Sequence, residues 1–187
     1  CRVMAYDPYA SQDAAQALGV ELVDLDKLFT PADAISVHVP YSKETHHIVD
    51  AHRIAQMKPS AVLVNTARGN LVDEDALYDA LKANRICGAG LDVFAQEPLP
   101  TTSKLLELDN LVLSPHFSSQ TVESLWNTYK MAIDIADDFF QGRDCPHILN
   151  PEYKDALWCV SRKPFQPLEV ICMKFEKHSL CHIPFCY

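Results

Sequence analysis

The sequence predicts an α/β protein built on a doubly wound parallel sheet, and three observations lead to this class. Short apolar segments alternate along the chain with segments of helical composition. The apolar segments are continuous instead of alternating with polar residues, which is typical of strands covered on both faces. Crossovers between parallel strands are right-handed, so a series of strand–helix units is expected to wind helices around one sheet.

The first half of the chain supplies three predicted strands. A strand at 3–6 ends at Asp7-Pro8, a pair of residues that starts turns, and a helix at 10–18 stops at Gly19. The other elements expected in this half are a strand at 20–23, a short helix at 25–29 capped by Asp24, a strand at 34–39 and a helix at 45–57.

The second half begins with the strand around which the site is expected to form. Residues 61–65 are apolar and rich in β-branched side chains, and they lead directly into Thr66, Ala67, Arg68 and Gly69. A helix then starts at Asp73 with an apolar face. The remaining elements expected here are a strand at 86–93, a strand at 111–113 and a long helix from about 121 to 140.

Composition and charge exclude several classes of partner. The chain has 187 residues and a formal net charge of -9, which argues against a nucleic-acid partner. No run approaches the ~18 apolar residues that a membrane span requires. No signal-peptide pattern is present either, so we expect a cytoplasmic protein with no membrane partner.

Two regions with different composition are expected. Residues 1–142 should form one domain, and residues 143–187 a return segment followed by a cysteine-rich tail. The tail carries four of the seven cysteines: Cys159, Cys172, Cys181 and Cys186. Their spacing to the tail histidines does not match that of structural zinc sites, so no metal is assigned.

Ionisable residues stand at successive strand ends. Asp7, Arg68 and His116 each come after a predicted strand, Asp92 lies at the end of the strand at 86–93, and Glu97 lies in the loop after Asp92. Because ligands bind at the carboxyl edge of open parallel sheets, these side chains are expected to share one site. An arginine can hold a carboxylate in two parallel hydrogen bonds, and a histidine oriented by a carboxylate can deliver a proton. These are the groups needed to reduce a keto acid.

Each of these residues also has an alternative structural interpretation. Arg68 could be a capping or surface-paired arginine, Asp7 a turn residue before Pro8, Glu97 part of an exposed loop, and His116 a structural histidine. Their coincidence at successive strand ends favours the joint functional interpretation.

Several motifs along the chain form one recognisable set. They are Asn65-Thr66-Ala67-Arg68-Gly69, Gly90-Leu91-Asp92-Val93-Phe94, Glu97-Pro98 and Ser114-Pro115-His116, with Met57-Lys58-Pro59 and Leu71-Val72-Asp73-Glu74 in support. On these motifs the chain resembles the D-isomer-specific 2-hydroxyacid dehydrogenases, and the match runs from about Arg2 to about Gly142 with order and spacing intact. The resemblance implies a Rossmann-like fold and the interconversion of 2-keto acids and D-2-hydroxy acids with NAD(H). It also implies a homodimer.

The resemblance assigns roles to the residues that match. Arg68 would bind the substrate carboxylate, His116 would be the general acid/base, and Glu97 would orient it. Asp7 would bond the adenosine ribose of NAD, where its charge disfavours NADP. The other cofactor contacts implied are Val39, Pro40, Thr66, Ala67, Arg68, Asp92 (to the nicotinamide carboxamide), His116, Ser118 and Ser119.

Two departures from the family pattern stand out. The glycines of the chain, Gly19, Gly69, Gly88, Gly90 and Gly142, form no G-x-G-x-x-G loop. The first strand and this loop, together with the substrate domain, would therefore lie outside the chain, which is expected to be truncated at its start. Ser118 also stands where the family usually has a smaller residue, and it is expected to cap the next helix.

Three functional alternatives follow from this pattern. The chain is an oxidoreductase subunit, a non-catalytic NAD-sensing or partner-binding regulator of the same fold, or an inactive fragment. The catalytic residues do not decide between the first two, because regulators that resemble this family can keep them.

Overall fold

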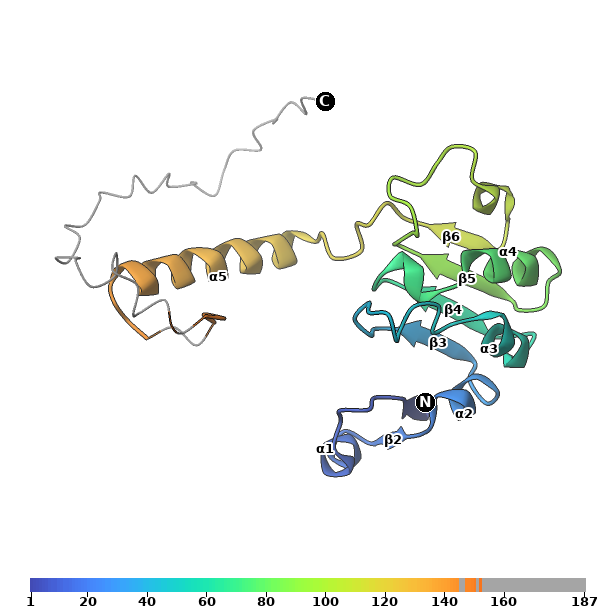
Figure 1. The fold of residues 1–187 in the computed structure, drawn as a ribbon, viewed down its shortest axis with the longest axis horizontal. Coiled ribbons are helices and arrows are strands. Elements are labelled where there is room, and N and C mark those ends of the chain that lie inside the picture. Colours follow the sequence, from blue (N-terminus) through green and yellow to red (C-terminus); the bar gives the residue numbers. More distant parts are fainter. Residues whose placement is uncertain (145–146, 151, 153–187) are drawn as a thin grey trace. The chain divides into compact units, whose positions relative to one another are not determined.

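The computed structural model describes residues 1–144, 147–150 and 152 (Figure 1). The chain divides into two compact units, Cys1–Thr121 and a second that begins at Val122. All predicted site residues belong to the first unit. The predictions for the tail beyond residue 152 lie outside the described residues.

The first unit contains a four-stranded parallel sheet in the order β3-β4-β5-β6. Its register pairs Val37 with Asn65, Asn65 with Leu91, and Leu91 with Leu113, so the four strands end side by side. The strands are β3 (Ala34–Val37), β4 (Val62–Asn65), β5 (Gly88–Leu91) and β6 (Leu111–Leu113). The predicted parallel α/β class is therefore confirmed.

A second, two-stranded parallel sheet precedes it. Strand β1 (Val3–Ala5) pairs with β2 (Val20–Leu22), and helix α1 (Gln12–Ala17) connects them. Ser11 caps α1 by accepting a hydrogen bond from the Ala14 amide. No hydrogen bond joins β1 to β3 in the described chain, so two sheets replace the single predicted sheet.

Helices α3 (Ala51–Gln56) and α4 (Glu74–Lys82) pack on one face of the four-stranded sheet, and α2 (Leu25–Phe29) contacts α3. Leu77 and Leu81 of α4 are fully buried against this face. Side chains on the opposite face, including Val64 and Val112, are exposed. Within residues 1–121, helices therefore cover one face of the four-stranded sheet. The continuous apolar strands had predicted helices on both of its faces.

The predicted helix at 45–57 is wrong in its first turn. Helix α3 begins at Ala51, after Asp50 accepts a hydrogen bond from the Arg53 amide. The preceding residues form a turn, in which the Thr45 hydroxyl donates to the Pro40 carbonyl and accepts from the Ser42 amide. Such local side-chain bonds compete with helical ones at Ser and Thr. Two short 3-10 turns, η1 (Gly69–Leu71) and η2 (Lys104–Glu107), were also not predicted.

The second unit is represented by α5 (Val122–Phe140), close to its predicted limits of 121–140. No helix in the described ranges is both long and apolar enough to cross a membrane. The proposed boundary at residue 142 stays a prediction.

Candidate active site

The Arg68 turn is held by a buried asparagine. Asn65, the last residue of β4, is fully buried. Its side-chain amide donates to the Arg68 carbonyl at 2.8 Å, and its oxygen accepts from the Ala67 amide at 3.0 Å. The Arg68 side chain is exposed, with one guanidinium nitrogen 2.6 Å from the Ala67 carbonyl. A rigid backbone therefore carries an accessible cation.

Gly69 brings this turn against the loop that carries Glu97. A Cβ added at Gly69 would lie 1.9 Å from the carbonyl carbon of Phe94 and 2.3 Å from the Ala95 amide nitrogen. Only glycine permits so close an approach of two backbones. In the same loop the Phe94 amide donates to Glu97 Oε1 at 2.9 Å.

Glu97 orients the imidazole of His116. The Nδ1 atom of His116 lies 2.8 Å from Glu97 Oε2, and both side chains are partly exposed. Because a carboxylate only accepts hydrogen bonds, Nδ1 carries the hydrogen and Nε2 is left for a substrate. The hydrogen bond from His116 and that from the Phe94 amide hold the pKa of Glu97 below its usual value, and the charge of Arg68 adds to them.

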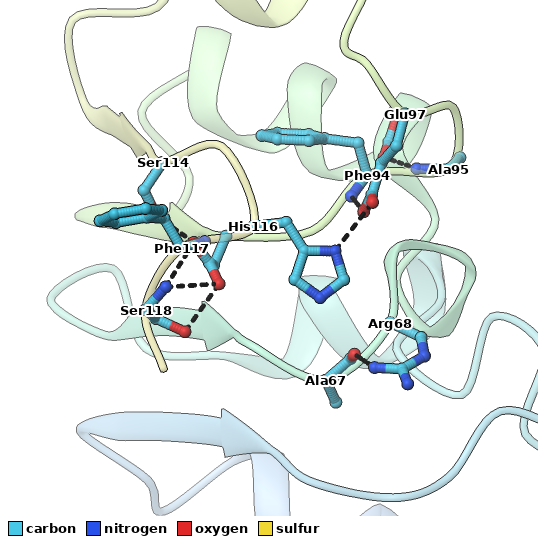
Figure 2. Close-up of polar contacts among 11 residues, drawn as sticks. Ala67, Arg68, Phe94, Ala95, Glu97, Ser114, His116, Phe117 and Ser118 are labelled. Carbon is cyan, nitrogen blue, oxygen red and sulfur yellow. Dashed lines mark hydrogen bonds and ion pairs between the residues drawn. The ribbon is translucent and has the colours of Figure 1, made fainter. Parts of the chain in front are cut away.

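Figure 2 shows these groups together at the strand ends. In this view the His116 imidazole lies between the Glu97 side chain and the Ala67–Arg68 turn. The site therefore offers a cation, a proton donor and the acceptor that orients the donor, all from loops that follow β4, β5 and β6. The arrangement can bind an anionic substrate and exchange a proton with it.

Asp92 directly follows β5 and is 3% exposed. Its carboxylate accepts hydrogen bonds from the Ser114 hydroxyl, the Phe117 amide, and both the amide and the hydroxyl of Ser118. Burial by itself would raise the pKa of Asp92, but the bonds from Ser114, Ser118 and Phe117 outweigh it and hold the pKa far below its usual value. A carboxylate accepts about four such bonds, so a further donor, such as a carboxamide, would have to displace one.

Ser118 does not cap the following helix as predicted. Its hydroxyl donates to Asp92 Oδ2 at 2.6 Å, and α5 begins only at Val122. The buried charge of Asp92 is a stronger acceptor for this hydroxyl than a distant helix end. Ser119 is exposed, and its carbonyl accepts from the Thr121 amide.

Four further residues were predicted to contact the cofactor: Asp7, Val39, Pro40 and Thr66. Asp7 is exposed after β1, where its side chain accepts from the Tyr9 amide at 2.8 Å, as expected of a turn residue. Val39 is partly buried, while Pro40 and Thr66 are exposed. In the described chain, the hydrogen bonds and ion pairs of Arg68, Glu97 and His116 do not extend to these four residues.

Three supporting residues were not assigned a role from the sequence. Asn65 fixes the Arg68 turn, Ser114 binds Asp92, and Glu74 accepts from the Ala95 amide at 2.6 Å. Asn65 carried a usable signal, since a polar residue that ends a buried strand must find hydrogen-bond partners. Serine beside a strand end and glutamate at a helix start carry no such signal. No cluster of three or more possible metal ligands occurs in the described ranges.

Comparisons with known proteins agree on one family. Residues 1–118 match the family model described as "D-isomer specific 2-hydroxyacid dehydrogenase, NAD binding domain". The chain is 43% identical over 151 residues to a glyoxylate reductase of Korarchaeum cryptofilum, covering 81% of this chain and 46% of that protein. It is 45% identical over 136 residues to a D-3-phosphoglycerate dehydrogenase of Synechocystis, covering 73% of this chain and 24% of that protein.

Solved structures give the same answer. The chain resembles a Lactobacillus jensenii D-lactate dehydrogenase determined with NAD+, with a TM-score of 0.73 and 29% identity over 80% of this chain and 48% of that one. The chain thus spans about half the length of the glyoxylate reductase and D-lactate dehydrogenase, and about a quarter of the phosphoglycerate dehydrogenase. The chain belongs to the D-isomer-specific 2-hydroxyacid dehydrogenase family, and residues 1–118 match its NAD-binding domain.

Proposed function

We propose that this chain carries the catalytic residues of an oxidoreductase that interconverts 2-keto acids and D-2-hydroxy acids with NAD(H). The observation that supports it best is the 2.8 Å hydrogen bond between His116 and Glu97 beside the exposed Arg68. The family of the chain supports the reaction type.

The proposed chemistry uses each group at a defined atom. The planar guanidinium of Arg68 binds the substrate carboxylate and draws electron density from the neighbouring carbonyl. As negative charge develops on the keto oxygen, the Nε2 atom of His116 donates a proton to it, and in the reverse direction Nε2 accepts this proton. Glu97 stabilises the imidazolium and keeps Nδ1 protonated. When NAD(H) is bound, it supplies or accepts the hydride at the substrate carbon.

The residues present fit part of this cofactor. Asp7 places an exposed carboxylate after β1, suited to ribose hydroxyls and repulsive to a 2′-phosphate, which favours NAD over NADP. Thr66, Ala67, Ser118 and Ser119 belong to the loops at the nicotinamide end in this proposal. The sequence has no G-x-G-x-x-G turn for the pyrophosphate.

A titration with NADH tests the cofactor part of the proposal. We expect the 187-residue chain to bind NADH weakly or not at all when nicotinamide fluorescence is followed, because no glycine loop holds the pyrophosphate. Micromolar affinity would contradict this expectation. Light scattering on the same sample would test whether the chain forms the homodimer that the family resemblance implies.

A chimera tests the chemistry. The part of the Korarchaeum cryptofilum glyoxylate reductase that precedes the matched region would be joined to Cys1, because the family resemblance implies a first strand and a glycine loop ahead of this residue. We expect NADH-dependent reduction of glyoxylate or hydroxypyruvate, and a ~10²–10⁴-fold loss of kcat on His116→Ala. Asp109→Asn, an exposed position away from the site, serves as the control. Unchanged turnover in His116→Ala would remove the proposed role of this histidine.

A further inference from the structure

The Asp92 carboxylate accepts hydrogen bonds from four donors in the segment 114–118, which carries His116. Asp92 follows β5 and is buried, and its hydrogen-bond donors belong to the segment that follows β6. Oδ1 accepts from the Ser114 hydroxyl at 2.5 Å and from the Phe117 amide at 2.8 Å. Oδ2 accepts from the amide and the hydroxyl of Ser118, at 3.1 and 2.6 Å. One carboxylate thus binds residues on both sides of His116.

The backbone of His116 is held by the same residue. Its amide donates to the Asp92 carbonyl at 2.8 Å. Its φ of 54° lies in the left-handed region, which residues other than glycine adopt rarely, although histidine does so more often than most. The contacts of Asp92 at positions 114, 116, 117 and 118 constrain this conformation, since each of them fixes one point of the turn.

The direction of the imidazole depends on this turn. The His116 side chain points towards Glu97. Its Nδ1 atom lies 2.8 Å from Glu97 Oε2, which is the one side-chain partner of this imidazole among the described residues. A different φ at His116 would move its Cβ and the ring with it, so the contact between Nδ1 and Glu97 Oε2 depends on this backbone conformation.

We propose that Asp92 and Ser118 are positioning residues that fix the left-handed turn at His116 and thereby direct its Nδ1 atom to Glu97. This inference rests on the proposed function for its catalytic meaning, but the geometric part can be measured without turnover. Asp92 acts through His116 and does not itself need to touch a substrate.

The test is nuclear magnetic resonance on the full 187-residue chain. Long-range proton–nitrogen correlations report the two ring nitrogens of His116, and amide hydrogen exchange reports Phe117 and Ser118. Asp92→Asn replaces one acceptor oxygen by a donor that faces the Ser118 amide and hydroxyl. We expect exchange at Phe117 and Ser118 to accelerate by about 10–100-fold, and the ring-nitrogen shifts of His116 to move towards those of an imidazole without a carboxylate partner.

Further variants separate positioning from general destabilisation. Ser118→Ala should shift the ring nitrogens in the same direction, and Ser118→Thr, which keeps the hydroxyl, should restore them. Asp109→Asn should change neither readout. If the ring-nitrogen shifts of His116 are unchanged in both Asp92→Asn and Ser118→Ala, the proposal is wrong. If Asp92→Asn does not fold, the Ser118 pair still decides.

The same variants in the chimera distinguish this inference from the proposed function. With an active wild-type chimera, Asp92→Asn should lower kcat by about 100-fold, the scale of a 1 Å misplacement of a catalytic group, with a smaller effect on KM. An inactive wild-type chimera would count against the proposed function, whereas the ring-nitrogen shifts would still support or overturn the role of Asp92 and Ser118. A loss confined to KM would contradict a positioning role.

Discussion

His116 Nδ1 and Glu97 Oε2 are 2.8 Å apart although the two residues are 19 positions apart in the sequence. The pair joins the loop after β5 to the segment after β6, at the edge where parallel strands end. The hydrogen bond from His116 also stabilises the charged form of Glu97.

Removal of the histidine should therefore raise the pKa of Glu97. The hydrogen bond from His116 is the largest of the interactions that keep this pKa below 4.5, so His116→Ala should move it back towards that value. The measurement is a pH titration of the Glu Cδ resonances in carbon-13-labelled protein. His52→Ala, on exposed helix α3 surface, is the control. An unchanged titration of Glu97 would show that the pair is not formed in solution.

The same pair predicts a direction for stability against pH. A carboxyl group whose pKa is lower in the folded state contributes stability that is present above its unfolded pKa and is lost as the pH falls. The free energy of unfolding should therefore fall below about pH 4.5, where unfolded glutamate becomes protonated. In His116→Ala the fall should be smaller. Urea unfolding at a series of pH values measures both curves.

Gly69→Ala should destabilise the fold because the new methyl group has no space. It would overlap backbone atoms of Phe94 and Ala95, which cannot move as a flexible side chain can. Overpacking of this kind costs about 1–3 kcal/mol. Gly90→Ala is the matched control, since its nearest contact would be Val64 Cγ2 at 4.0 Å. Urea unfolding should show a clear loss for Gly69→Ala and little change for Gly90→Ala; equal losses would contradict the close backbone approach.

The strand ends could be predicted from the sequence because buried parallel strands leave continuous apolar runs. That pattern predicts Arg68, Asp92 and His116 at one edge of the sheet. The His116–Glu97 contact followed from the family resemblance, and the structure brings the two side chains together. The roles of the other cofactor residues stay predictions.

Long-range hydrogen bonds could not be predicted in the same way. Ser118 was expected to cap a helix, since serine before a helical segment often does so. Its actual acceptor, Asp92, is 26 residues away in sequence, and nothing local indicates that pairing. Residues 45–50 form a turn, but the sequence pattern predicted a helix there. The local hydrogen bonds of Ser42 and Thr45 that hold this turn leave no signal in the sequence that would distinguish it from a helix.

Asn65→Asp should destabilise the Arg68 turn although the change in shape is small. The asparagine side-chain nitrogen donates to the Arg68 carbonyl, and a carboxylate oxygen in its place would face another acceptor. We expect a loss of about 1–3 kcal/mol at pH 7, from an unsatisfied buried group. The loss should be smaller near pH 4, where a protonated carboxyl can donate again. Asn84→Asp, at an exposed position, is the control, and equal losses in the two variants would contradict the role of Asn65.

Asp73→Ala should weaken the start of helix α4. The Asp73 carboxylate accepts hydrogen bonds from the amides of Asp75 and Ala76, both at 3.1 Å, and so satisfies two of the amides that a helix leaves without partners. Loss of such a cap costs about 1 kcal/mol, within a range of about 0.5–2. Because Leu77 and Leu81 of α4 are buried in the core, local fraying should appear as a lower global free energy of unfolding. Asp24→Ala is the matched comparison, since Asp24 precedes α2 without a side-chain bond to the helix backbone. Urea unfolding should show the larger loss for Asp73→Ala, and the reverse order would contradict the capping geometry.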